Sequence, residues 1–305
     1  MRTMLQLKIP APGSLNTFTV AMLFSSYLWA IVAAATSAQT VLGVVDSSKG
    51  SLPDDSAFTY NRTHFLLHGE PFTIIGGQMD PQRIPHQFWR DRLSKARAMG
   101  LNTIFTYPFW NELEPKQGDW RSDEPQNDIA TFFRTAQEEG LYVVLRPGPY
   151  ICGERDWGGF PSWLSEIPGL VVRSDNKPFL KQASRYLSNL ANKAGLADLQ
   201  ISRGGPILMV QVENEYGSYG DDHDYTAAVR DIVRDNFEAT LYTNDGGGAD
   251  WTLTGGQIPG VLAAVDGGAY ALPSRDEYIT DPSSLGPLLN GGKLTITRSM
   301  AETGY

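Results

Sequence analysis

Carboxylate, amide and aromatic side chains follow several short apolar runs of this sequence, and together they have the chemistry of a sugar-binding site. The C–H faces of a sugar ring pack on aromatic rings, whereas its hydroxyl groups need directed hydrogen bonds. The sequence therefore predicts a carbohydrate pocket. The residues that follow three of the runs are Tyr107, Trp110, Asn111 and Glu112, then Arg146, Tyr150, Glu154, Asp156 and Trp157, then Glu213, Asn214, Glu215 and Tyr216.

The apolar runs that must position these residues are typical of buried parallel strands, and amphipathic stretches lie between the earlier ones. No glycine-rich G-x-G-x-x-G turn opens the first helix, which favours a (β/α)8 TIM barrel over an open doubly wound sheet. In such a barrel the residues after each strand form the active site. The predicted strands are 72–75, 103–107, 142–145, 207–212, 240–243 and 261–265, and the predicted helices are 85–99, 128–139, 178–194 and 224–236.

The composition excludes several classes of protein and partner. The chain has 305 residues, of which 41% are hydrophobic and 19% are charged, and this composition indicates a globular protein. Its net charge is −9, and although no acidic residue precedes Asp46, no stripe of basic residues is long enough to follow a nucleic-acid backbone. We therefore expect no nucleic-acid partner. One cysteine, Cys152, and four histidines without close pairing predict neither a disulfide nor a metal site, and we expect no cofactor.

The first 38 residues are typical of a secretory signal peptide. Arg2 and Lys8 precede an apolar stretch that ends in small residues, which predicts cleavage near Ala38 and a location outside the cell or in a vacuolar or lysosomal lumen. The alternative is an uncleaved membrane anchor; after cleavage we expect no membrane association. In this setting Asn61-Arg62-Thr63 is a glycosylation sequon, which predicts a surface position for Asn61. Residues 39–60 are interpreted as an irregular lead-in.

Five ordered blocks of the sequence resemble the glycoside hydrolase family 35 β-galactosidases. The resemblance covers about residues 65–290, and we interpret residues 61–290 as a partial catalytic barrel domain. The blocks are EPFTIIGGQMD (70–80), RIP with FWRDRL (83–85 and 88–93), GLNT (100–103) with Tyr107 and Trp110-Asn111, LRPGPYICGE (145–154) and GPILMVQVENEYGSYG (205–220).

The resemblance implies a retaining exo-β-galactosidase that acts on a β-galactoside through two glutamates of a (β/α)8 barrel. Glu215 matches the acid/base, which protonates the departing glycosidic oxygen and later deprotonates water. Asn214 matches the amide that contacts the sugar 2-hydroxyl. Further substrate-binding positions are matched by Tyr107, Cys152, Gly153 and Glu154, with Glu154 suited to grip a galactose hydroxyl.

Other interpretations of these residues remain open. Glu213 lies two residues before Glu215 on a predicted strand, so both side chains are expected to point inward. A buried carboxylate needs a partner, and we expect Glu213 to be structural and to pair with Arg146. Cys152 is alternatively a small apolar filler.

The sequence departs from the family where the second carboxylate is expected, after the seventh strand. The family block is present as Gly286-Pro287-Leu288-Leu289-Asn290, but Gly292 stands in the place of the nucleophile and the residues after it no longer match. We interpret 291–305 as an aberrant tail of a truncated or frame-shifted chain that lacks the eighth strand and is inactive as written. The alternatives are a galactose-binding pseudo-enzyme and another exo-β-glycosidase.

Overall fold

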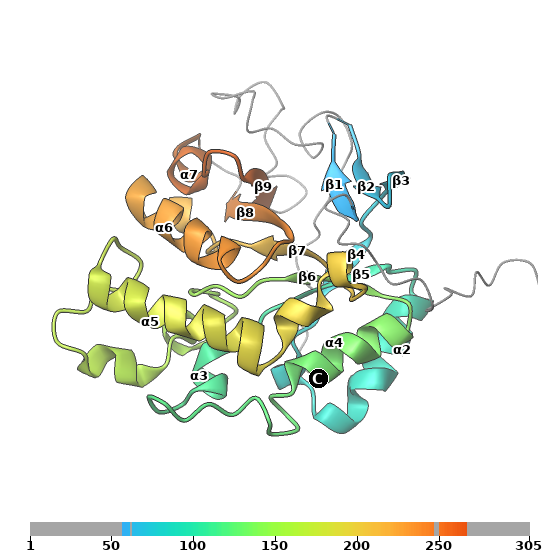
Figure 1. The fold of residues 1–305 in the computed structure, drawn as a ribbon, viewed down its shortest axis with the longest axis horizontal. Coiled ribbons are helices and arrows are strands. Elements are labelled where there is room, and N and C mark those ends of the chain that lie inside the picture. Colours follow the sequence, from blue (N-terminus) through green and yellow to red (C-terminus); the bar gives the residue numbers. More distant parts are fainter. Residues whose placement is uncertain (1–56, 62, 247–249, 267–305) are drawn as a thin grey trace, which may run out of the picture. The chain divides into compact units, whose positions relative to one another are not determined.

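The computed structural model describes residues 57–61, 63–246 and 250–266, all within the compact unit Ser51–Tyr305. Six parallel strands form one sheet in which each strand pairs with the next along the chain (Figure 1). This sequential order is that of a curled, incomplete barrel. The strands are β4 (Gly76–Gln78), β5 (Thr103–Thr106), β6 (Tyr142–Leu145), β7 (Ile207–Gln211), β8 (Thr240–Gly246) and β9 (Leu262–Asp266). The expected signal peptide, seventh strand and Gly292 lie outside the described residues.

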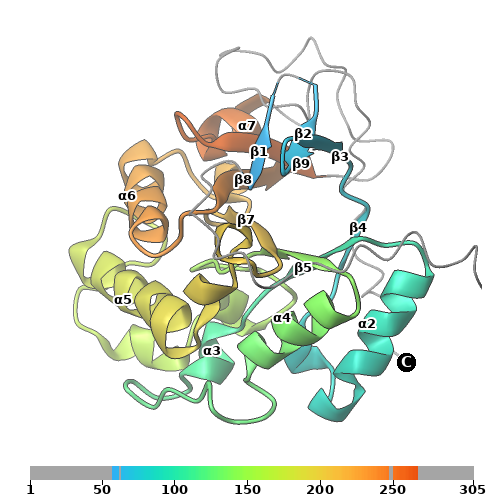
Figure 2. The same ribbon diagram turned by 45° about the vertical axis from the view of Figure 1, so that its right-hand side comes forward.

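Helices lie in an arc around the sheet, with α2 against α4 and α5 against α6 (Figure 2). The α-helices are α2 (Trp89–Ala98), α3 (Trp110–Leu113), α4 (Ile129–Glu138), α5 (Lys177–Ser188), α6 (His223–Arg234) and α7 (Asp250–Gly256). A π-helical turn, η5 (Asn189–Lys193), extends α5. The 3-10 helices are η1 (Pro81–Arg83), η2 (His86–Phe88), η3 (Asp156–Gly159), η4 (Ser162–Glu166), η6 (Leu196–Leu199), η7 (Ile201–Arg203) and η8 (Tyr216–Ser218).

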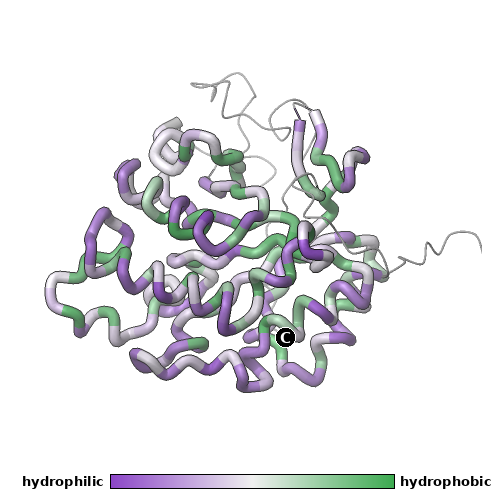
Figure 3. Tube along the Cα trace, viewed as in Figure 1, coloured by the Kyte–Doolittle hydropathy of each residue, from purple (hydrophilic) through white to green (hydrophobic). Residues whose placement is uncertain are grey.

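Helices α4, α5 and α6 begin in the same way. A side-chain oxygen of Asp128, Asn176 or Asp222 accepts a hydrogen bond from a backbone N–H in the first turn. These caps satisfy donors that the helix itself leaves unpaired. Hydrophilic and hydrophobic residues alternate along these helices (Figure 3), and the hydrophobic ones pack on the sheet. The predicted helices are therefore confirmed to within a few residues.

A small antiparallel sheet covers the amino-terminal end of the barrel. It consists of β1 (Phe58–Tyr60), β2 (Phe65–Leu67) and β3 (Glu70–Phe72). Phe58 and Phe65 pack with the residues that fill the barrel interior, including Phe105, Val144, Met209 and Tyr242. The lead-in expected to be irregular through residue 60 therefore already forms a strand at Phe58–Tyr60.

The first predicted barrel strand, 72–75, is wrong. Strand β3 ends at Phe72, and the barrel strand β4 begins at Gly76, directly after the predicted range, and contains Gly76 and Gly77. The ring of Phe105 explains their presence, because a Cβ atom on Gly76 would lie only 2.5 Å from it. A glycine in a strand allows this close approach.

Candidate functional site

The predicted site residues meet at the carboxyl ends of the parallel strands, as expected for a barrel. Tyr107 directly follows β5, and Cys152, Gly153 and Glu154 lie in the loop after β6. Asn214 and Glu215 follow β7. Tyr107 and Asn214 are buried, Cys152 and Glu215 are half-buried, and Glu154 is exposed.

The amide of Asn214 is held in one orientation by three donors. Its Oδ1 atom accepts hydrogen bonds from the Tyr107 hydroxyl at 3.0 Å, from Arg146 Nη2 at 2.9 Å and from Gln211 Nε2 at 2.9 Å. The amide nitrogen has no hydrogen-bond partner among the described residues. Because the oxygen side is fully engaged, the Nδ2 hydrogens are directed away from this network and are free to donate to a ligand.

Arg146 organises the centre of the site through amide groups. Its guanidinium donates to Gln211 at 2.7 Å and to Gln78 at 2.9 Å, in addition to Asn214, and lies 4.1 Å from the centre of the Tyr107 ring. Burial raises the pKa of Tyr107 well above its ordinary value, against the influence of Arg146. The Tyr107 hydroxyl is therefore protonated and acts as a donor.

The expected pair of Glu213 and Arg146 is wrong. Glu213 is paired with Arg173, with contacts of 3.2 and 2.6 Å, and both side chains are buried. The strand ends at Gln211, and both Glu213 and Glu215 adopt positive φ values of 60° and 49°. The alternation that would point both carboxylates inward therefore does not apply. Glu213 is buried in an ion pair, but its partner comes from a distant loop rather than from the neighbouring strand.

The turn that carries Glu215 is attached to strand β8. The backbone N–H of Glu215 donates to the Asn244 carbonyl at 2.8 Å, and that of Gly217 donates to Asp245 at 2.9 Å. Helix α7 covers this turn so closely that a Cβ atom on Gly217 would lie 1.5 Å from the Thr252 carbonyl oxygen. Tyr216 is buried and packs in the hydrophobic core.

The loop after β6 presents Glu154 at the surface. Its carboxylate has no hydrogen bond or ion pair with the described residues. Cys152 lies outside the hydrophobic clusters and interacts with Tyr150, whose pKa is raised by burial and by Cys152. The Gly153 carbonyl accepts a hydrogen bond from Arg83. These contacts fix the backbone of the loop and leave the Glu154 side chain available.

Sequence reasoning missed Asp80 as a residue that organises the site. Its Oδ1 accepts hydrogen bonds from the Tyr107 backbone N–H at 2.9 Å and from Gln78 at 2.5 Å, and Oδ2 accepts one from Arg83 at 3.2 Å. Burial raises the pKa of Asp80, while these hydrogen bonds oppose the increase. Its position two residues after the end of an unrecognised strand, β4, is the signal that would have identified it.

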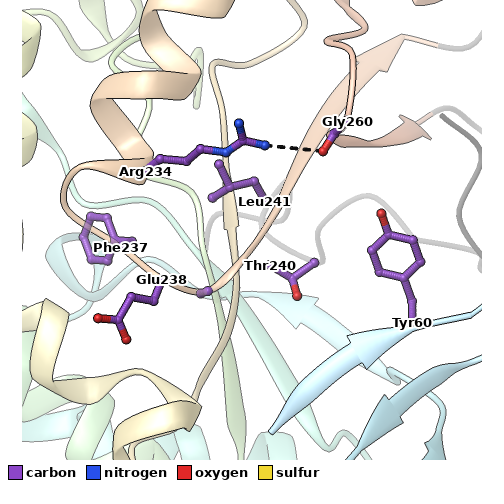
Figure 4. A pocket seen from close by; sticks show the side chains of 8 residues that line it. Tyr60, Arg234, Phe237, Glu238, Thr240, Leu241 and Gly260 are labelled. Carbon is purple, nitrogen blue, oxygen red and sulfur yellow. Dashed lines mark hydrogen bonds between the residues drawn. The ribbon is translucent and has the colours of Figure 1, made fainter. Parts of the chain in front are cut away.

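A cavity of about 360 Å³ lies at the opposite end of strand β8, away from these residues (Figure 4). It is lined mainly by residues that precede or begin β8, with Arg234 donating to the Gly260 carbonyl at 3.5 Å. None of the predicted site residues lines it. The candidate site and this cavity are therefore separate features.

Three further observations concern the described residues. They include no cluster of three or more His, Cys, Asp or Glu side chains placed to hold a metal ion. No helix in this part of the chain is long and apolar enough to cross a membrane. Asn61 is exposed, as its sequon predicted, and its side-chain oxygen accepts a hydrogen bond from the Thr63 hydroxyl at 3.0 Å.

Comparisons with known proteins identify the family to which the chain belongs. The model of the glycosyl hydrolases family 35 matches residues 64–283. The chain is 47% identical over 206 residues to a beta-galactosidase of Xanthomonas manihotis, covering 67% of this chain and 33% of that protein. It is 45% identical over 207 residues to beta-galactosidase 8 of Oryza sativa subsp. japonica, covering 66% and 30%.

These relatives and a solved structure place the chain in its family and fold. The chain spans about a third of the length of these curated relatives. A crystal structure of GH5_18 from Streptomyces cattleya in complex with GlcNAc superimposes with a TM-score of 0.50 at 18% identity, over 65% of this chain and 52% of that one, which supports the barrel fold. From the family match and these identities, the chain is a member of glycosyl hydrolases family 35.

Proposed function

We propose that this chain supplies the acid/base half of a β-galactosidase site that cleaves terminal β-galactosides with retention. The observation that carries the proposal is the amide of Asn214, fixed by three donors with its nitrogen free, next to Glu215 in the sequence. An amide nitrogen held in this way can donate to a sugar hydroxyl. The names of the relatives, beta-galactosidases, support galactose as the sugar.

In the proposed reaction Glu215 donates its proton to the glycosidic oxygen as the bond to the anomeric carbon breaks. Asn214 donates to the 2-hydroxyl, and this hydrogen bond strengthens as positive charge develops on the ring. Glu154, exposed and without a partner among the described residues, accepts from another galactose hydroxyl. A retaining reaction also needs a carboxylate on the opposite face, and Gly292 stands where the family resemblance places it.

An external nucleophile tests this proposal on the 305-residue chain itself. Azide is small enough to attack the anomeric carbon from the face opposite Glu215. The C–N bond forms, the bond to the leaving oxygen breaks with its electron pair, and that oxygen takes the proton of Glu215. Phenyl β-galactoside and azide should therefore give phenol and α-galactosyl azide, whose anomeric configuration is assigned by NMR.

Two matched measurements interpret the result. Dinitrophenyl β-galactoside has a leaving group that departs without a proton, so its turnover reports on binding and azide attack alone. Phenyl β-glucoside in place of the galactoside tests whether the site prefers galactose to glucose. Galactose binding by calorimetry without azide-dependent turnover of either galactoside would contradict the proposed activity and would favour a galactose-binding protein.

A further inference from the structure

Arg173 lies in the loop between η4 and α5, about forty residues from the turn that carries Glu215, yet it contacts that turn directly. We infer that Arg173 is a positioning residue for Glu215, acting through Glu213 and the Asn214 peptide. This inference rests on the proposed function for its catalytic consequence. Its structural part, that Arg173 fixes the turn, stands on the geometry alone.

The contacts of Arg173 form a closed ring with the first half of the turn. Its guanidinium donates to Glu213 at 3.2 and 2.6 Å and to the Asn214 carbonyl at 2.8 Å. The Glu213 carboxylate in turn accepts from the Asn214 backbone N–H at 2.8 Å. Glu213 therefore binds the backbone N–H of Asn214, and Arg173 binds its carbonyl oxygen, so both backbone groups of the residue before Glu215 are held.

Aromatic rings enclose this ion pair. The guanidinium carbon of Arg173 lies 3.8 Å from the centre of the Tyr150 ring and 4.3 Å from that of Tyr219, and the Tyr225 hydroxyl donates to Glu213 at 2.8 Å. The side chains of Arg173 and Glu213 are only 5% and 2% exposed. Charge-assisted hydrogen bonds in so dry an environment are strong and geometrically specific.

The backbone explains why the turn needs such an anchor. Glu213 and Glu215 both have left-handed backbone conformations, which cost free energy in residues other than glycine. Strand β8 holds the second half of the turn through the Glu215 N–H. Without Arg173 the first half of the turn would lose its anchor, and we expect the backbone that directs the Glu215 side chain to loosen.

The chain contains a matched control for this ion pair. Arg185 makes a bidentate pair with Glu114 at 2.6 and 2.9 Å, and the Glu114 side chain is fully buried. This pair also lies against an aromatic ring, that of Trp163, but has no contact with the 213–217 turn. The Arg185 side chain is 34% exposed, so a substitution of Arg185 leaves a buried carboxylate without its arginine partner while keeping the anchor of Glu215.

The experiment compares Arg173→Met, Arg185→Met and the double variant Arg173→Met/Glu213→Leu. The double variant leaves no unpaired buried charge, so it recovers stability without restoring the anchor. We expect amide hydrogen exchange in residues 212–218 to rise at least about 10-fold in both variants that lack Arg173, and to stay unchanged in Arg185→Met.

Azide-supported turnover measures the catalytic consequence. In both variants that lack Arg173, the rate with phenyl β-galactoside should fall about 100-fold, since small misplacements of a reacting group have effects of this size. With dinitrophenyl β-galactoside it should fall less than about 3-fold, because that leaving group needs no proton. Arg185→Met should change both rates equally.

Two results would overturn the inference. One is unchanged exchange in residues 212–218 when Arg173 is removed. The other is an equal loss of rate with both galactosides in the double variant, which would make Arg173 merely structural. If the unsubstituted chain shows no azide-dependent turnover, the proposed function fails, whereas the exchange measurement still decides whether Arg173 fixes the turn.

Discussion

Residues with positive φ occur at both ends of the barrel strands, but the residue types differ between the two ends. Turns that enter strands and loops that leave them both contain residues with positive φ. Before the strands these positions are glycines: Gly100 (93°), Gly140 (76°), Gly204 (82°) and Gly260 (72°). After β6 and β7 they include residues with side chains: Cys152 (58°), Glu154 (48°), Trp157 (51°), Glu213 (60°) and Glu215 (49°).

This difference indicates that the loops after the strands are less stable than they would be with glycine, because their side chains are needed for the site. A left-handed conformation costs a residue other than glycine about 1–2 kcal/mol, and glycine avoids most of that cost. The entering turns have no side-chain task, so glycine serves there. At the exits the strain is tolerated because Glu213 and Glu215 are needed, the first to anchor the turn and the second for the proposed proton transfer.

The substitution Glu154→Gly is expected to have the largest effect among the variants that test the difference between the two strand ends. Glu154→Gly removes a proposed charged hydrogen bond to galactose, and such bonds contribute about 1.5–3 kcal/mol, so galactose affinity should fall about 10- to 100-fold. The same variant should be up to about 1 kcal/mol more stable, because relieved backbone strain exceeds the entropy that glycine adds to the unfolded chain. Calorimetric titration with galactose and urea unfolding measure the two changes.

Glu154→Asn is the matched control, because asparagine tolerates the left-handed region but carries no charge. It should lose affinity as the glycine variant does and gain less stability. Unchanged galactose binding in Glu154→Gly would remove Glu154 from the proposed substrate contacts. Lower stability of that variant would contradict the assignment of strain to the loop after β6.

Gly100→Ala should have the smaller and opposite effect. A Cβ atom at Gly100 meets no other atom within 4 Å, so its cost comes from the backbone conformation alone. We expect a loss of about 1 kcal/mol in the free energy of unfolding and no change in galactose affinity. Urea unfolding and calorimetry measure both quantities.

Gly100→Asn tests the cause of that loss. Asparagine visits the left-handed region more readily than alanine and should recover part of the stability. If alanine and asparagine are equally destabilising, or if either weakens galactose binding, the entering turns and the exits do not differ in the way described.

Much of the fold was predictable from the sequence because hydrophobic runs mark buried strands. The predicted runs from 103 onward coincide with β5 to β9 within a few residues, and the position of the site after β5, β6 and β7 follows from them. Strand β4 was missed because glycines replace its apolar residues where Phe105 packs.

The internal organisation of the site was less predictable. Arg173 comes from a loop about forty residues before Glu213, and no local pattern connects the two. The expected direction of Glu213 also failed, because positive φ values break the alternation on which the prediction depended. Long-range ion pairs and backbone reversals of this kind are set by the packed structure rather than by the residues next to them in the sequence.

The proposed acid/base role of Glu215 is tested most directly by Glu215→Gln in the azide-supported reaction. Removing the proton donor should slow phenyl β-galactoside turnover about 100- to 10,000-fold and leave dinitrophenyl β-galactoside turnover nearly unchanged. Equal rates for the variant and the unsubstituted chain with phenyl β-galactoside would contradict the account.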